Sequence, residues 1–450
     1  MDRKLPDHAA ATADPDRGFC LVFDVGKTNK KAFVFDEHYR VVEERSAVLP
    51  ETTDEDGFPC EDLARLREWV LDTFRTLLDT PSGTRVRAVH CTAYGASLVH
   101  LDAVGEPLTP LYNYLKPCPS ALTDAFFQEN GPRADLSLET ASPILGFLNS
   151  GMQLYWLRRQ HPGRYRRIRW SLHLPQYLAW LLAVETARRT GRPYARLHPT
   201  DERTSLGCHT FLWDFRRNDY HTWVRKTGIV EKFPPLRSQD WGWTFPWQGG
   251  RLRVGIGLHD SSAALVPYLA TTSEPFLLLS TGTWCIALNP FDRRPLTLSD
   301  LSADCLSYNS IHGSPVKAAR YFGGNRHDGE VRSMARRFGV AEDFYRSLSS
   351  GTGGDELVQA YHTLMESLVG EQVASLALAR GDTLVTRLYV DGGFSHNPVF
   401  MAKLAAAVPD CSVYAASVAQ ATALGAALAI RDHWNPGPLR EGLVESRRIG

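Results

Sequence analysis

The sequence predicts two α/β domains with a duplicated architecture, and three observations carry that prediction. The chain has 450 residues, whereas one hydrophobic core stops growing beyond roughly 250–300 residues. The segment Phe19 to Phe35 is an apolar strand, a polar turn and a second apolar strand, and the segment Pro275 to Asp292 repeats this pattern. A third segment, from Arg387 to Val408, predicts a strand, a glycine turn and a helix.

The composition excludes several classes of partner. With 50 basic and 50 acidic side chains the formal charge is zero, so no whole-molecule field favours nucleic acid or an anionic membrane. The eight cysteines form no C-x-x-C pair, which argues against a structural zinc site or a disulfide framework. No apolar run approaches the roughly 20 residues that span a bilayer, and residues 1–17 predict a disordered polar tail rather than a signal peptide. We therefore expect a cytoplasmic protein without nucleic-acid or membrane partners.

The first hairpin contains Gly26-Lys27-Thr28, which alone resembles the end of a Walker A phosphate loop. A true phosphate loop has a glycine five residues before its Gly-Lys, and a helix follows it. Leu21 occupies that glycine position, and the residues after Thr28 are rich in β-formers. The stretch therefore predicts a strand, a tight polar turn and a strand.

Three turns in the sequence share the chemistry that binds phosphate or nucleoside groups. The first and second hairpins place a glycine beside hydroxyls, and backbone N–H groups at such turns grip phosphate oxygens. In the third segment, Gly392 and Gly393 follow a strand, and Asn397 stands at the predicted helix start. Each hairpin alone is interpreted as an ordinary β-hairpin, whereas the three segments together predict a binding cleft.

Asp260 follows a predicted strand and precedes a helix rich in alanine and leucine. Two interpretations stay open at this point. Aspartate is a favourable helix N-cap, worth about 1 kcal/mol. Alternatively, its carboxylate accepts a proton from a substrate hydroxyl that attacks a γ-phosphate.

These four segments together resemble the FGGY family of carbohydrate kinases, from Gly18 to about Trp434. The stretches "DVGKTNKK" and "STGTW" resemble the family's two phosphate motifs, "VDGGFSHNPVFMAKLAA" resembles its adenosine motif, and "GLHDSSAA" resembles the segment with the catalytic aspartate. The resemblance implies two duplicated actin-like domains, related to ribonuclease H, with ATP and a sugar in a central cleft. The domains would span 18–257 and 258–450.

The resemblance also implies residue roles. Asp260 would be the catalytic base, and Asp24 would organise the water shell of Mg²⁺. ATP would contact residues of both hairpins and of the glycine turn, namely Asp24, Gly26, Lys27, Thr28, Asn29, Lys31, Thr281, Gly282, Thr283, Gly392, Gly393 and Asn397. The sugar would contact Tyr94, Gly95, Ser97, His259 and Asp260.

The motifs are most similar to rhamnulokinase and L-fuculokinase members of the family, so a deoxyketose of that type is favoured as the substrate. At the sugar loop, Tyr94-Gly95-Ala96-Ser97 stands where rhamnulokinases usually carry Trp-Gly-Val-Asp, and the carboxylate is absent. The loss of an acid that would bind sugar hydroxyls keeps a pentulose kinase of the xylulose or ribulose type open as an alternative.

Two alternatives come from other classes of protein. One is a catalytically weakened sugar-binding or regulatory protein, suggested by Ser97 and by Lys116, where acidic residues are usual. The other is an actin-like assembly protein. Retention of Asp260 favours a kinase, acting as a monomer or homodimer. The tryptophans between Trp156 and Trp247 are interpreted mainly as core residues rather than as a sugar-stacking surface.

Overall fold

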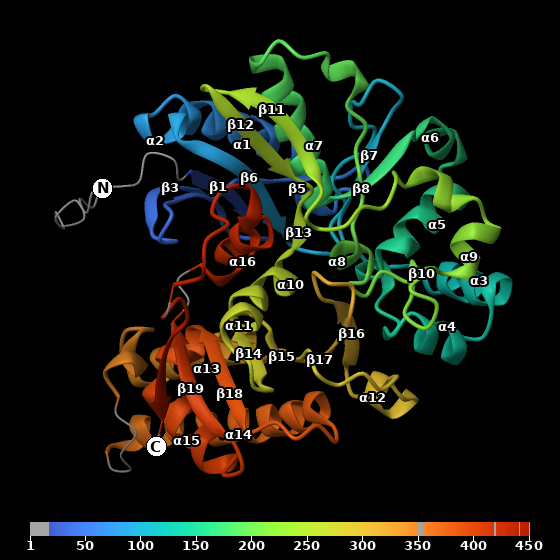
Figure 1. The fold of residues 1–450 in the computed structure, drawn as a ribbon. Coiled ribbons are helices and arrows are strands. Elements are labelled where there is room, and N and C mark those ends of the chain that lie inside the picture. The colour runs from blue at the N-terminus through green and yellow to red at the C-terminus, as the bar shows by residue number, and fades with distance from the viewer. Residues whose placement is uncertain (1–17, 349–353, 418–419, 441, 450) are drawn as a thin grey trace.

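The structure is a computed structural model that describes residues 18–348, 354–417, 420–440 and 442–449. The tail predicted for residues 1–17 lies outside the described residues. Figure 1 shows two halves, each built on a sheet, with a helical region beside the first half. None of the helices in the described part of the chain combines the length and apolar character that a membrane crossing needs.

The first sheet has seven strands in the order β11-β12-β6-β1-β2-β3, with β13 paired to β6. β1 is antiparallel to β2 and parallel to β6. The apolar run of the first hairpin explains why β1 is buried on both faces. The strands are β1 (Phe19–Val25), β2 (Lys30–Phe35), β3 (Val41–Ala47), β6 (Val86–Ala93), β11 (Gly242–Trp247), β12 (Gly250–Gly255) and β13 (Leu258–His259).

The second sheet repeats this arrangement in the order β16-β17-β15-β14-β18-β19-β20. β14 is antiparallel to β15 and parallel to β18, as β1 is to β2 and β6. The repeat confirms the predicted duplication. The strands are β14 (Leu277–Thr281), β15 (Cys285–Asn289), β16 (Cys305–Asn309), β17 (Pro315–Tyr321), β18 (Arg387–Gly392), β19 (Ser412–Ser417) and β20 (Glu445–Ile449).

Helices cover both sheets and connect the two halves. One apolar cluster packs α1 and α7 against the first sheet, and another packs α13, α14 and α15 against the second. A third cluster runs from the inner face of one sheet to the other through α11 and α16. The C-terminal helix α16 packs on β1, β6 and α10, as its position in Figure 1 shows. These helices are α1 (Leu63–Leu78), α7 (Leu174–Arg189), α10 (Asp260–Ala264), α11 (Val266–Thr271), α13 (Gly323–Phe338), α14 (Glu356–Arg380), α15 (Pro398–Ala407) and α16 (Ala421–Ala429).

The helical region beside the first sheet has its own aromatic core. Trp156, Trp213 and Trp223 are buried there, which confirms the core role expected for these tryptophans. The region is built from α3 (Ser120–Asn130), α4 (Arg133–Glu139), α5 (Ser150–Gln160), α6 (Pro162–Arg167), α8 (Arg203–Leu206), α9 (Thr222–Lys226), β9 (Trp213–Asp214) and β10 (Asp219–Tyr220). The remaining short elements are α2 (Pro81–Thr84), α12 (Leu298–Ser302), β4 (Glu51–Thr53), β5 (Pro59–Glu61), β7 (Leu98–Leu101) and β8 (Trp170–His173).

Candidate active site

The first predicted phosphate turn joins β1 to β2 and is open to solvent. The N–H of Gly26 donates to the carbonyl of Asn29 at 2.9 Å, and the side chains of Thr28 and Asn29 are exposed. The two lysines predicted beside the phosphates lie partly exposed on the surface. Lys27 Nζ is 3.2 Å from Glu51 Oε1, and Lys31 Nζ is 3.4 Å from Glu44 Oε1.

Asp24 lies at the end of β1, directly before this turn. Its Oδ2 accepts a hydrogen bond of 2.6 Å from the hydroxyl of Thr422, which α16 places there. The pKa of Asp24 is raised to about 6, mainly by burial and to a smaller extent by the charge of Asp260, whereas Thr422 and Lys31 act in the opposite direction. Asp24 and Leu258 both pair with Thr92 of β6, so Asp24 lies at the same end of the first sheet as Asp260, and we call the two residues the carboxyl pair.

Asp260 is the first residue of α10 and the second member of that pair. The helix N-cap is His259 rather than Asp260, so the interpretation of Asp260 as the cap is wrong. Its Oδ1 accepts from the backbone N–H of Ser261 at 2.6 Å and lies 3.2 Å from His259 Nε2. Burial raises the pKa of Asp260 to about 6, although 30% of the side chain remains exposed. The carboxylate is thus accessible and poised to exchange protons near neutral pH.

The predicted sugar residues lie around the end of β6. Gly95 makes close approaches, because a Cβ atom there would lie 2.9 Å from Cys208 Sγ and 3.1 Å from the ring of His259. Tyr94, Ser97 and His259 are buried. Burial lowers the pKa of His259 to about 3, with a further contribution from the charge of His173, so the ring is neutral at physiological pH. These residues form the surroundings of Asp260.

The second predicted phosphate turn joins β14 to β15. The N–H of Gly282 donates to the carbonyl of Trp284 at 2.9 Å, and both Gly282 and Thr283 are exposed. Thr281 is buried instead. Its hydroxyl donates to the carbonyl of Asp391 and accepts from the N–H of Phe394 at 3.0 Å. Thr281 therefore joins the turn to the glycine segment after β18, and its hydroxyl is already engaged within the protein.

A cavity of about 210 Å³ lies beside this second turn. Gly392 has a φ of +84°, and a Cβ atom there would lie 1.9 Å from the carbonyl oxygen of Thr281, so only glycine fits. Asn397 caps α15 through its Oδ1 and donates to the hydroxyl of Tyr361 at 2.7 Å, so it holds the cavity wall in place. The cavity is lined by Thr281, Gly282, Gly324, His327, Asp328, Tyr345, Gly393, Phe394 and Asn397. It thus brings together residues from two of the predicted nucleotide segments.

A wider cavity of about 790 Å³ lies beside α1. Apart from the exposed Glu68, its charged side chains are paired with other protein groups, as in the 2.9 Å contact of Arg67 Nη1 with Glu106 Oε2 and the 2.8 Å contact of Arg75 Nε with Glu185 Oε1. A cavity whose charges are largely neutralised within the protein offers few groups to orient a ligand. We assign it no role.

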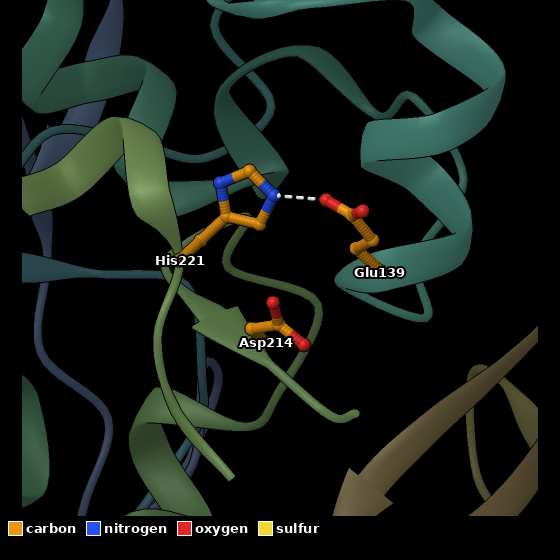
Figure 2. A group of neighbouring side chains, drawn as sticks. All are labelled: Glu139, Asp214 and His221. Carbon is orange, nitrogen blue, oxygen red and sulfur yellow. Dashed lines mark hydrogen bonds and ion pairs between the residues drawn. The ribbon is translucent and has the colours of Figure 1, made fainter. Parts of the chain in front are cut away.

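The fold also brings together Glu139, Asp214 and His221, whose ligand atoms lie within 4.8 Å of one another (Figure 2). His221 Nδ1 accepts the N–H of Trp223 at 3.2 Å, which places the ring proton on Nε2, and Nε2 donates to Glu139 Oε2 at 2.8 Å. Neither ring nitrogen of His221 then offers a lone pair to an ion. Asp214 accepts the N–H of Arg216, whose guanidinium lies 3.8 Å from Glu139. The cluster is a hydrogen-bonded structural group, and we assign it no metal.

The sequence reasoning missed three residues at this site, Lys30, Glu61 and Thr422. The sequence pattern could have indicated Lys30, because this residue shares the inward face of β2 with Ala32 and Val34, where a charge is unexpected. No sequence pattern indicates Thr422, since it contacts Asp24 only through tertiary packing of α16.

Comparisons with known proteins agree with this geometry. The chain matches the N-terminal domain of the FGGY family of carbohydrate kinases over residues 19–188 and the FGGY C-terminal domain over residues 273–351, together more than half of its length. It is 26% identical over 288 residues to an L-fuculokinase from Salmonella typhi. That match covers 60% of this chain and 56% of the L-fuculokinase, so it spans little more than half of the relative's length.

Solved structures match over nearly the whole chain. A carbohydrate kinase from Novosphingobium aromaticivorans has a TM-score of 0.75 at 25% identity, covering 96% of this chain and 94% of that chain. A ligand-bound xylulose kinase from Lactobacillus acidophilus has a TM-score of 0.74 at 15% identity, covering 96% and 93%. The second likeness shows the fold alone. The fold class is therefore the duplicated actin-like one that the sequence predicted.

Proposed function

We propose that this chain, which belongs to the FGGY family of carbohydrate kinases, transfers the γ-phosphate of ATP to a hydroxyl of a ketose. The observation that carries the proposal is the carboxyl pair of Asp24 and Asp260. Asp24 and Leu258 both pair with Thr92 of β6, so Asp24 and Asp260 lie at the same end of the first sheet, and the charge of Asp260 contributes to the raised pKa of Asp24.

Asp260 is the base in this proposal. Its carboxylate accepts the proton of the ketose hydroxyl while the hydroxyl oxygen forms a bond to the γ-phosphorus, and the bond from that phosphorus to the bridging oxygen of ADP breaks. A pKa of about 6 leaves the carboxylate ionised at neutral pH yet basic enough to hold the proton. The 30% exposure of the side chain leaves room for contact with a substrate.

ATP would bind to both predicted phosphate turns and in the cavity beside the second turn. The cavity of about 210 Å³ is lined by Tyr345 and Phe394, whose aromatic rings would contact the nucleoside. Gly282 and Thr283 offer exposed backbone to the phosphates, and the turn from Gly26 would receive the γ-phosphate. Thr281 and Asn397 contribute by holding these walls, since their polar atoms bond within the protein.

The acidic groups present fit a Mg²⁺ ion. Asp24 and Asp260 bring two carboxyl groups to one end of the first sheet, and a divalent cation would offset the unfavourable effect of the Asp260 charge on Asp24. Asp24 would hold the ion through its water shell, with its Oδ2 oriented by Thr422. When bound, Mg²⁺ neutralises charge on the transferring phosphate group.

For the acceptor we favour a deoxyketose of the rhamnulose or fuculose type. The 26% identity with an L-fuculokinase supports this choice. The neutral side chains of Tyr94 and Ser97 leave a pentulose of the xylulose or ribulose type as the second candidate, because the loop has no acid there to require a particular hydroxyl pattern.

A coupled ADP-release screen tests the proposal, using L-rhamnulose, L-fuculose, D- and L-xylulose and L-ribulose with Mg²⁺ and ATP. We expect ADP release that depends on one ketose, and sugar phosphate in the products. ATP turnover without sugar, accompanied by increased light scattering, would instead indicate an actin-like assembly protein. Ketose binding by calorimetry without turnover would indicate a regulatory protein.

A further inference from the structure

Beneath the first turn lies a buried lysine that the roles assigned above do not use. Lys30 on β2 has an exposed fraction of 2%. Its Nζ donates to the carbonyl of Gly26 at 3.1 Å and to the carbonyl of Lys27 at 3.0 Å. A buried ammonium is costly unless its charge is balanced and its protons are bonded. The sequence Asn29-Lys30-Lys31 thus sends one lysine inward and its neighbour outward.

Glu61 balances that charge. Its Oε1 lies 2.6 Å from Lys30 Nζ, and its exposed fraction is only 5%. Its Oε2 accepts a hydrogen bond from the hydroxyl of Tyr94, the first residue of the predicted sugar loop. The carboxylate of Glu61 therefore connects the first phosphate turn to the predicted sugar loop, although the two are far apart in sequence.

The lysine also decides which way the peptide groups of the turn point. In a trans peptide the carbonyl of one residue and the N–H of the next point in opposite directions. Because the carbonyls of Gly26 and Lys27 point inward to Lys30, the N–H groups of Lys27 and Thr28 point outward. Neither N–H, nor that of Asn29, has a hydrogen-bond partner among the residues that the structure describes. Successive free N–H groups of this kind bind anions.

We infer that Lys30, held by Glu61, is a positioning residue that presets the first turn to receive the γ-phosphate of ATP. Lys30 does not contact the phosphate, because its ammonium already binds two carbonyls and a carboxylate. The inference deepens and rests on the proposed function, because it names the group that orders one part of the same site. It differs from the sequence-based expectation, which placed Lys31 beside the transferring phosphate and left two alternatives for Lys27, a contact with the phosphate or a position in solvent.

The test compares binding of a triphosphate and a diphosphate. Removing Lys30 alone would leave Glu61 as an uncompensated buried charge, so the main variant is Lys30→Met combined with Glu61→Leu, which replaces the pair by apolar groups of similar size. Calorimetry with Mg²⁺ measures the affinity for the β,γ-imido analogue of ATP and for ADP. We expect the analogue to bind about 10- to 100-fold more weakly than to the wild type, the range produced by loss of oriented donors. ADP affinity should stay within about twofold.

Lys317→Met is the control for loss of a buried lysine elsewhere, and Arg294 still pairs with Asp292 in that variant. Lys317 is also a largely buried strand lysine with acidic partners, Asp292 and Asp300, but it lies away from both turns on β17. The control should keep the wild-type ratio of the two affinities. A double variant that keeps that ratio, or a wild type that does not favour the triphosphate, overturns the inference. If the wild type phosphorylates no ketose and the double variant still loses its triphosphate preference, the positioning role stands and the proposed function fails.

Discussion

The contact between α10 and α16 should set the geometry of the carboxyl pair, and Gly425→Ala tests this. Gly425 lies in the middle of α16, three residues after Thr422, which donates to Asp24. A Cβ atom at Gly425 would lie 1.9 Å from the carbonyl oxygen of Ala263 on α10, whereas ordinary contact begins at 3.4 Å. The two helices must therefore separate by about 1.5 Å at this point.

That separation moves Asp260, which begins α10, away from Asp24. Overpacking of this kind costs about 1–3 kcal/mol of stability. Misplacement of a catalytic group by about 1 Å costs on the order of 100-fold in turnover. We therefore expect Gly425→Ala to lower kcat by about 100-fold or more, with a lower thermal unfolding midpoint.

The assay measures ketose-dependent ADP release and thermal unfolding of two variants. The matched control is Gly370→Ala, because Gly370 is an exposed glycine inside α14 with no atom within 4 Å of an added Cβ. Alanine there should stabilise the helix by about 1 kcal/mol and leave turnover unchanged. If folded Gly425→Ala keeps wild-type turnover, the contact does not position Asp260.

Three further predictions follow from the charges at the site. The pKa of Asp260 is raised to about 6, and the base must be ionised to accept a proton. The value of kcat/KM should therefore fall as pH decreases through 6 and stay level above about 7. A profile that is flat down to pH 5 would contradict the assigned base. Asp24 has a pKa of about 6 in place of 3.8, so its contribution to stability is fully present below pH 3.8 and lost as pH rises through 6. Asp24→Asn should therefore stabilise the unliganded protein at pH 7.5 by up to about 3 kcal/mol, with a smaller gain at pH 4.5, and equal unfolding midpoints at pH 7.5 would refute this. Lys27 pairs with Glu51 at the surface, so Lys27→Ala should change the KM for ATP by less than about threefold, and a large increase would place its ammonium on the phosphate.

The sequence was sufficient for the parts of the site that depend on local pattern. The two hairpins predicted from Phe19 to Phe35 and from Pro275 to Asp292 appear as β1–β2 and β14–β15, because a continuous apolar run and a glycine turn are recognised within a few residues. The predicted glycine turn between a strand and a helix also appears, between β18 and α15, because glycine tolerates the φ of +84° at Gly392, and its neighbour Gly393 lines the cavity of about 210 Å³.

The direction of individual side chains was harder to predict. Thr281 and Asn397 carry the polar groups expected at a nucleotide site, yet their hydrogen bonds hold the walls of the cavity. The pairs Lys30–Glu61 and Asp24–Thr422 join residues that meet only after the fold is complete. A pattern within one segment contains no information on such partners.

The assignment of Asp260 as the base is the centre of this account, and one measurement tests it most directly. Wild type and Asp260→Asn are mixed with ATP labelled in its γ-phosphate, Mg²⁺ and the ketose found by the screen, and transfer of label to the sugar is followed in a single turnover. We expect wild-type transfer, and in the variant a loss of at least about 100-fold with ATP affinity unchanged by calorimetry. Near-normal transfer by Asp260→Asn would contradict the account.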